Sequence, residues 1–134
     1  MGTFQLNMLS AERPFYQGEC TSLVVPISDG QYGIQAGHSN MIAAIIPGMV
    51  KITTDKDEII IAAVSEGMVK CENNQVLLLV DTAERPEEID EIRARESMEE
   101  AKEAMLQKKS IKDYYMAQDK MARALNRLRV KNRN

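Results

Sequence analysis

The sequence is poor in the residues that usually carry catalysis or metal binding. Its 134 residues include one histidine, His38, and two cysteines, Cys20 and Cys71. The patterns H-E-x-x-H, C-x-x-C and G-x-x-x-x-G-K-[ST] do not occur. We therefore expect no metal site and no independent enzymatic activity. Two cysteines are too few for a disulfide framework, so both are expected to be reduced and half-buried in strands.

Long apolar runs are also missing. The longest, 41–46 and 59–64, have six residues each, far below the roughly 18 needed to span a bilayer. The first ten residues lack the basic and apolar regions of a secretory signal. We expect a cytosolic chain that is not inserted in a membrane and reaches one only through a protein partner.

Glycine and proline are absent from residues 87–134, a segment rich in good helix formers. Pro86 with two following acids predicts a helix over 87–106, and a capping-box pattern at Ser110 and Asp113 predicts a second over 111–130, with the bend at 107–109. The two helices should form an antiparallel hairpin, weakly held because alanine buries little and methionine packs adaptably. Its apolar stripes are Ala94, Met98, Ala101 and Met105 on one helix, and Tyr114, Ala117, Met121, Leu125 and Leu128 on the other.

Residues 1–85 differ in composition and pattern. Short runs rich in β-branched residues are separated by turn signals every eight to ten residues. Alternation around Phe4 and Val50 predicts half-buried strands. Continuous apolar runs at 23–27, 41–46, 59–64 and 76–80 predict strands covered on both faces. The spacing favours a β-sandwich or barrel, giving two parts, 1–85 and 86–134.

Charge divides along the same chain. Residues 1–85 carry 5 Lys and Arg against 10 Asp and Glu, residues 86–103 carry 3 against 8, and residues 104–134 carry 9 against 2. Arg123 and Arg127 are four residues apart, so both side chains lie on one face of the basic helix. Two arginines placed in this way can bind a phosphate or a row of carboxylates. The alternative is that they form a polar face exposed to solvent. No RNA-binding or helix-turn-helix signature accompanies the charge, so nucleic acid is not an expected partner. His38 is either a pH-sensitive or interface residue or a locally bonded loop histidine.

An ordered set of motifs resembles the epsilon subunit of bacterial F-type ATP synthases. It comprises VPISDGQYGIQAGH at 25–38, IPGMV at 46–50, VSEGMV at 64–69, Asn74 and Val76, and DTAE at 81–84. The resemblance implies a flattened antiparallel β-sandwich followed by a helical hairpin. It also implies a non-catalytic rotor subunit of the central stalk, peripheral to the cytoplasmic face of the cell membrane. The alternative is a free-standing nucleotide-sensing or scaffold protein.

The resemblance also implies partners. The sandwich would bind the gamma subunit and the polar loops of the membrane ring, using Asp29, Gly30, Gln31, Tyr32 and His38 toward the ring. The hairpin would permit turnover when folded. When extended along gamma into the catalytic alpha/beta head, it would inhibit ATP hydrolysis, and the basic helix would meet an acidic segment of the beta subunit.

Some members of this family bind ATP as a regulatory ligand through the motif I/L-D-x-x-R-A. Residues 89–94, IDEIRA, match it in full, so the motif includes Ile89 and Ala94. The resemblance implies that Glu84 and Asp90 contact the adenine or ribose side. It implies that Arg93, Arg123 and Arg127 hold the phosphates.

Overall fold

The computed structural model describes residues 2–107 and 111–132, apart from the side chains at 106–107 and 111–114. Most of the expected bend at 107–109, the Ser110–Asp113 capping pair and the side chain of Tyr114 lie outside the described residues. The chain divides into two compact units, Met1–Arg85 and Pro86–Asn134. No helix among the described residues is long and apolar enough to cross a membrane.

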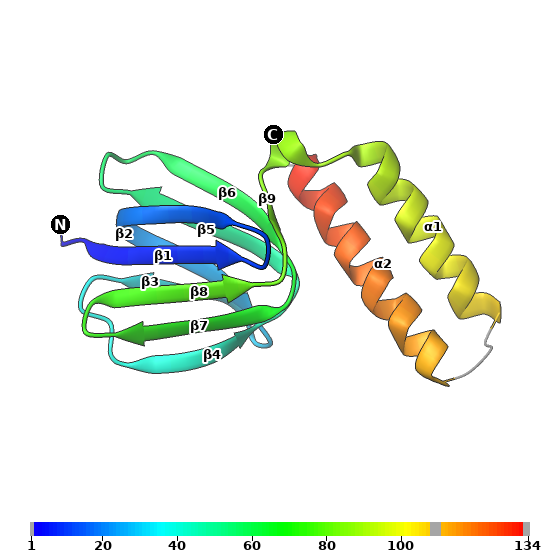
Figure 1. Ribbon diagram of the computed structural model, residues 1–134, viewed down its shortest axis with the longest axis horizontal. Coiled ribbons are helices and arrows are strands. Elements are labelled where there is room, and N and C mark those ends of the chain that lie inside the picture. The colour runs from blue at the N-terminus through cyan, green and yellow to red at the C-terminus, as the bar shows by residue number, and fades with distance from the viewer. Residues whose placement is uncertain (1, 108–110, 133–134) are drawn as a thin grey trace. The chain divides into compact units, whose positions relative to one another are not determined.

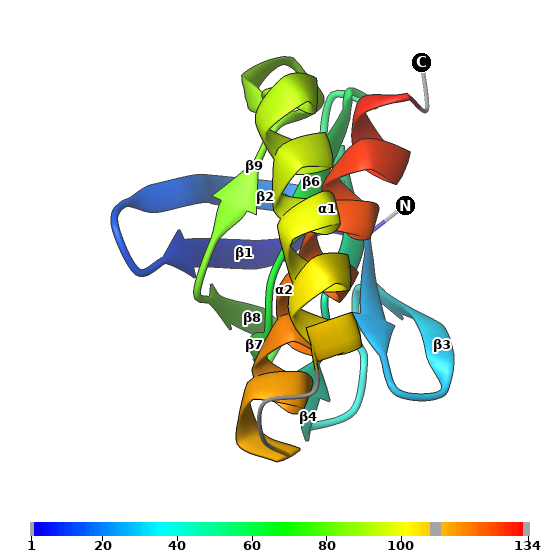
Figure 2. The same ribbon diagram turned by 90° about the vertical axis from the view of Figure 1, so that its right-hand side faces the viewer.

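The first unit is a two-layered β-structure (Figures 1 and 2). Its strands run in the spatial order β4-β7-β8-β1-β2-β5-β6-β9, and β3 pairs with β2. Their bounds are β1 Phe4–Ser10, β2 Pro14–Ile27, β3 Gly30–Gln35, β4 Met41–Ile45, β5 Gly48–Thr54, β6 Ile59–Val64, β7 Gly67–Glu72, β8 Gln75–Val80 and β9 Ala83–Glu84.

The long strand β2 joins the two layers. Its first half pairs with β1, and its second half pairs with β3 and β5. The register with β5 shifts between Cys20 and Ser22, and such an irregularity bends a strand and increases its twist. One strand can therefore serve both layers, which enclose a single apolar core containing Phe4, Leu6, Leu23, Ile52 and Leu78.

The β-sandwich predicted from the sequence is confirmed, with one exception to its antiparallel pairing. Among the described strands, β1 and β8 run parallel, and all the other pairs are antiparallel. These two strands lie far apart in the sequence, so no tight turn forces them to run in opposite directions. The expectation of half-buried cysteines was wrong, because Cys20 and Cys71 are free and buried, at 0% and 3% exposed.

Strand β4 differs from the expectation for the run 41–46. Ile42 is 69% exposed and Ile46 is 41% exposed, whereas the sequence predicted cover on both faces. Strand β4 lies at the end of the sheet order and pairs only with β7 among the described strands. The run is apolar on both faces, but the part of the chain that the structure describes covers only one of them.

A glycine permits the close approach of β7 and β8. An added Cβ at Gly67 would overlap the carbonyl oxygen of Leu79 and lie 2.7 Å from Val80 Cα. We expect Gly67→Ala to lower the free energy of unfolding by about 3 kcal/mol, since backbone must move to make room. Gly33→Ala is the matched control, because no heavy atom lies within 4 Å of its Cβ position. Urea unfolding measures both, and equal stabilities would contradict the assignment.

The second unit is a helical hairpin, as predicted. It consists of the short 3₁₀ turn η1 Pro86–Glu88, α1 Glu91–Gln107 and α2 Ile111–Lys131. The predicted start of the first helix at residue 87 was wrong. Asp90 Oδ1 accepts a hydrogen bond from the Arg93 N–H at 3.1 Å, so Asp90 is the N-cap and the α-helix begins after it.

Alanines line the seam between α1 and α2. Ala94 and Ala101 are fully buried, and Ala117 and Ala124 are nearly so. Leu128 of the predicted stripe is also buried, whereas Met98, Met105, Met121 and Leu125 are half-buried. An alanine side chain removes little apolar area from water, which is in line with the weakly held hairpin predicted from the sequence; its stability stays a prediction.

Candidate functional site

The hairpin brings two of the predicted phosphate-binding residues to the same level. Lys120 Nζ lies 2.6 Å from Glu100 Oε2 and links the two helices. In an antiparallel pair, equal steps in opposite directions keep residues level. Arg93 lies seven residues before Glu100 and Arg127 seven after Lys120, so the two are level. Arg123 lies about one turn from Arg127 on the same helix.

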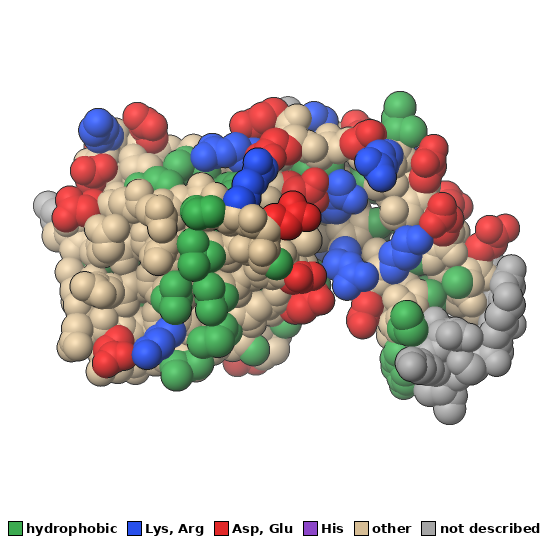
Figure 3. All heavy atoms as spheres, viewed as in Figure 1, with side chains coloured by type: hydrophobic (Ala, Val, Ile, Leu, Met, Phe, Trp, Pro, Cys, Tyr) green, Lys and Arg blue, Asp and Glu red, His purple; other side chains and the backbone are tan. Residues whose placement is uncertain are grey.

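These arginines differ in exposure. Arg93 is exposed, whereas Arg123 and Arg127 are half-buried and have polar contacts. The Nε atom of Arg127 is itself buried and makes no hydrogen bond. Figure 3 shows Lys and Arg side chains gathered along the hairpin. Guanidinium groups from two helices can reach a polyanion together only while the helices lie side by side.

The other residues of the 89–94 motif have structural positions. Asp90 is the N-cap of α1, which makes Ile89 the preceding N′ residue and Ala94 the N4 residue. Both are buried, at 3% and 0% exposed, and occupy the two positions of a hydrophobic staple. The motif therefore starts the helix and holds Arg93 on its first turn. Glu84 is half-buried at the end of β9 and belongs to the other unit.

Charge pairs also shape the hairpin. The hydrogen bond from Lys120 lowers the pKa of the Glu100 carboxyl, so this link is present at neutral pH and is lost as pH falls through the acid range. Arg95 pairs with Glu91 one turn earlier at 3.0 Å, an exposed pair of small energy. Among the described residues, no group of His, Cys, Asp and Glu could hold a metal ion.

A hydrogen bond joins two of the residues that are predicted to face the membrane ring. The Tyr32 hydroxyl lies 2.7 Å from His38 Nε2, and His38 Nδ1 lies 2.7 Å from the Ser39 carbonyl oxygen. Because a carbonyl only accepts, Nδ1 carries the proton, and in the neutral ring Nε2 accepts from Tyr32. His38 is thus a loop histidine with local hydrogen bonds, as in the second of the two interpretations drawn from the sequence. Asp29, Gly30 and Gln31 are exposed around the β2–β3 turn, where Gly30 has φ 119°.

The outward face of β4, β7, β8 and β1 carries an apolar row that the sequence analysis missed. The cross-strand partners are Ala44 with Met68, Met68 with Leu79, and Leu79 with Leu9. The residues next to this row along each strand, including Met8 and Leu78, are buried in the core. Because successive side chains of a strand point to opposite faces, the row points away from the core. Figure 3 shows hydrophobic side chains in a strip across these strands. The signal lay in the run 76–80, which is apolar at both alternating sets of positions.

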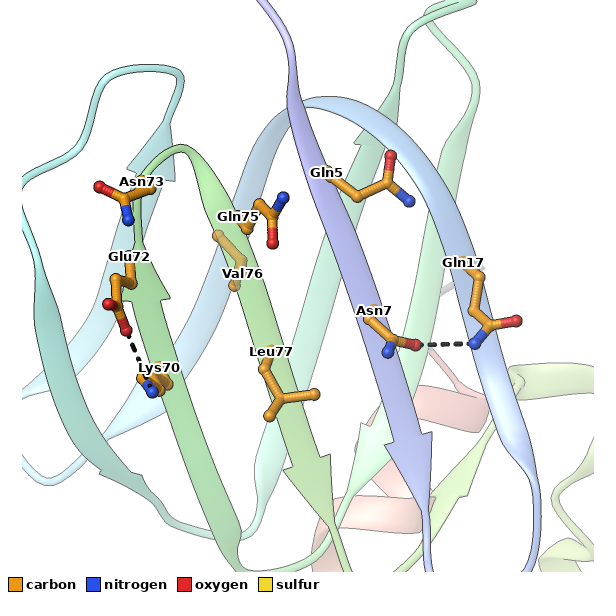
Figure 4. Close-up of a pocket in the computed structure, with 9 residues that line it drawn as sticks. All are labelled: Gln5, Asn7, Gln17, Lys70, Glu72, Asn73, Gln75, Val76 and Leu77. Atoms are coloured by element: carbon orange, nitrogen blue, oxygen red, sulfur yellow. Dashed lines mark hydrogen bonds and ion pairs between the residues drawn. The ribbon is translucent and has the colours of Figure 1, made fainter.

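A shallow polar groove of about 730 Å³ adjoins this row. In Figure 4 it is bordered by amide side chains, with Gln17 donating to Asn7 at 2.9 Å, and by the ion pair of Lys70 with Glu72. We call the apolar row and the groove together the outer face of the sandwich. An apolar strip with a polar border has the make-up of a protein-binding surface.

Comparison with known proteins matches each unit to a family. Residues 3–86 match the β-sandwich domain of the ATP synthase delta/epsilon chain, and residues 87–132 match the long α-helix domain of the same chain. The ATP synthase epsilon chain of Ruminiclostridium cellulolyticum is 37% identical over 133 residues, covering 99% of this chain and 98% of that one. The epsilon chain of Nitrosospira multiformis is 36% identical over 128 residues, covering 96% and 92%.

Solved structures share the fold. A chain of the Euglena gracilis mitochondrial ATP synthase, in a structure of OSCP, F1 and c-ring, superposes with a TM-score of 0.80 at 17% identity, covering 91% of this chain and 77% of that one. A chain of the Tetrahymena thermophila mitochondrial ATP synthase, from its central stalk and c-ring, gives 0.68 at 13% identity, covering 96% of each. The sequence matches extend over both units in order, and this chain therefore belongs to the ATP synthase delta/epsilon family.

Proposed function

We propose that this chain is a non-catalytic subunit of the rotor of an F-type ATP synthase. The observation that supports the proposal best is the match of nearly the whole chain to curated epsilon chains, with both domains in order. In this proposal the sandwich docks on the gamma subunit and on the polar loops of the membrane ring. The chain is then peripheral to the cytoplasmic face of the membrane, held there by its partners.

The outer face is the proposed docking surface for gamma. Its apolar row lies on adjacent strands rather than scattered singly, and Ile42 on β4 extends it to the edge of the sheet with 69% of its surface exposed. Burying such a row against a partner would be favourable at about 25 cal/mol per Å² of apolar surface removed from water. The groove beside it offers amides that can hydrogen-bond across an interface.

The hairpin is the proposed regulator. ATP is its proposed ligand, bound by Arg93, Arg123 and Arg127, and it favours the folded hairpin because the phosphates bridge the two helices. Without ATP the weakly held hairpin opens, and the basic α2 reaches the acidic surface of the catalytic head. The exposed polar residues around the β2–β3 turn, with Tyr32 and His38, face the ring.

A matched pair of exposed isoleucines tests the docking surface. Ile42→Glu places a charge at the edge of the outer face, opposite Lys70 in the register, so folding should be preserved. We expect it to weaken gamma binding at least tenfold, the effect of losing an interface anchor. Ile59→Glu is the control, since Ile59 is 58% exposed on β6, away from these strands in the sheet order.

Binding to purified gamma is measured by calorimetry with the full chain. Equal losses in the two variants, or none in Ile42→Glu, would count against this surface. Thermal unfolding of both variants checks that each remains folded.

A further inference from the structure

Three segments of the first unit meet at one end of the sandwich: the β7–β8 turn, the start of β1 and the loop 36–40 between β3 and β4. Figure 1 shows the N-terminal end and the β7–β8 turn at this end. The turn residues Asn73 and Asn74 have φ of 52° and 62°, in the left-handed region that asparagine tolerates and tight hairpins require.

Asn74, in the β7–β8 turn, forms hydrogen bonds with the other two segments. Its Nδ2 donates to the Thr3 carbonyl oxygen at 2.8 Å, and its Oδ1 accepts from the Gly37 N–H at 2.9 Å. Its backbone carbonyl accepts from the Gln5 N–H at 3.2 Å. A single side chain therefore ties the loop and the residue preceding β1 to the turn, and both the donor and the acceptor of its amide are used.

Other residues of the loop 36–40 also contact the turn and the residues before β1. The Asn73 N–H donates to Asn40 Oδ1 at 3.4 Å, and a Cβ at Gly2 would lie 3.1 Å from that of Ala36. At the centre of the loop, the His38 ring is bonded to Tyr32 on β3 and to the Ser39 carbonyl. The loop is thus held to the turn by Asn74 and to β3 by the histidine.

We propose that Asn74 is a positioning residue that holds the loop 36–40, and with it His38 and Tyr32, in the geometry that docks on the polar loops of the membrane ring. The inference rests on the proposed function, in which Tyr32 and His38 face the ring together with the β2–β3 turn, which lies at the other end of β3. A loop that is ordered before docking loses less conformational entropy on binding, so removing its tie weakens the docked state.

Two glycine substitutions separate this role from the turn itself. Asn74→Gly and Asn73→Gly both keep a residue suited to positive φ, but only Asn74→Gly removes the bonds to Gly37 and Thr3. We expect the Gly37 amide of the full chain to exchange with deuterium at least about fivefold faster in Asn74→Gly, the effect of one lost hydrogen bond. Its exchange in Asn73→Gly should match the wild type.

The conservative variant Asn74→Asp keeps one of the two side-chain hydrogen bonds and removes the other. Its carboxylate can accept from Gly37 but cannot donate to Thr3, so Gly37 protection should be retained. If Asn74 only stabilised the turn, protection of the Gly37 amide would not depend on whether residue 74 carries a side-chain acceptor. Unchanged Gly37 exchange in Asn74→Gly, or acceleration in Asn73→Gly as large, would overturn the proposal.

The functional measurement is the affinity of the full chain, in complex with gamma, for the detergent-solubilised ring. We expect about a tenfold loss for Asn74→Gly and near wild-type affinity for Asn73→Gly and Asn74→Asp. Faster exchange with unchanged ring affinity overturns the positioning role alone. A wild-type chain that fails to bind the ring overturns the proposed function as well, so the two failures are distinguishable.

Discussion

Replacing Arg93 and Arg127 together with alanine is expected to weaken ATP binding at least a hundredfold. The two residues lie at the same level of the hairpin, seven residues on either side of the Glu100–Lys120 link. A hydrogen bond to a charged group contributes about 1.5 to 3 kcal/mol, so losing two costs about 3 kcal/mol or more, which is a factor of about 100. Calorimetry on the full chain measures the binding directly.

The matched control removes two arginines from the same helices. Arg95 is paired with Glu91, and Arg129 is exposed near the end of α2. Arg95→Ala with Arg129→Ala changes the net charge equally and should change ATP binding little. Absence of binding to the wild-type chain at millimolar ATP, or undiminished binding by the Arg93 and Arg127 variant, would contradict the proposed site.

Substitutions of Asp90 distinguish the cap from a nucleotide contact. Asparagine retains an acceptor for the Arg93 N–H and is as good an N-cap as aspartate, whereas alanine is not. If Asp90 acts through the helix start, Asp90→Asn keeps ATP binding and Asp90→Ala reduces both binding and helix content by circular dichroism. Loss of binding in Asp90→Asn with unchanged helix content would instead assign a direct contact.

Binding of ATP should also stabilise the folded hairpin. At a hundred times its dissociation constant, a ligand that binds only one state adds about 2.7 kcal/mol to it. The alanine-lined seam supplies little apolar burial, so a contribution of this size is enough to change which hairpin state is populated. The nucleotide would then act on regulation without any catalytic step in this subunit.

Deleting residues 110–134 is expected to raise ATP hydrolysis by the assembled enzyme several-fold. The deletion removes α2 and most of the segment with 9 basic against 2 acidic residues. That segment is the proposed contact with the acidic surface of the catalytic head, so the inhibited state should lose its main attraction. Assembly should be preserved, because the sandwich has a core of its own within residues 1–85.

A shorter deletion provides the control. Removing residues 132–134 leaves α2, which ends at Lys131, in place, and hydrolysis should stay at the wild-type level. Hydrolysis unchanged by the longer deletion would exclude inhibition by α2. Failure of the deleted chain to join the complex would show that docking requires the hairpin, contrary to the proposed division of roles.

Periodicity and turn residues were sufficient to predict the two-part architecture. Alternation around Phe4 and Val50 and the absence of glycine and proline after Pro86 reflect local rules that the folded chain obeys. The helix start was misplaced because Pro86 and Asp90 are both good start signals, and only the observed bond to Arg93 shows that Asp90 caps the α-helix. Similarly, an apolar run such as 41–46 does not reveal whether its second face is covered by this chain or by a partner.

The sites depend on distant pairings that no local pattern contains. Arg93 and Arg127 come to the same level only through the register of the hairpin. The outer face exists only because β1, β8, β7 and β4 align Leu9, Leu79 and Met68. Asn74 looked like an ordinary turn residue. Its contacts with Thr3 and Gly37, far away in the sequence, require the tertiary fold.

Co-purification of the tagged full chain with the gamma subunit tests the central claim most directly. If the chain is a rotor subunit, a complex of one chain with one gamma is expected by size-exclusion chromatography with light scattering, and Ile42→Glu should disrupt it while Ile59→Glu does not. A chain that remains a solitary monomer in the presence of folded gamma would contradict the account and favour a free-standing protein.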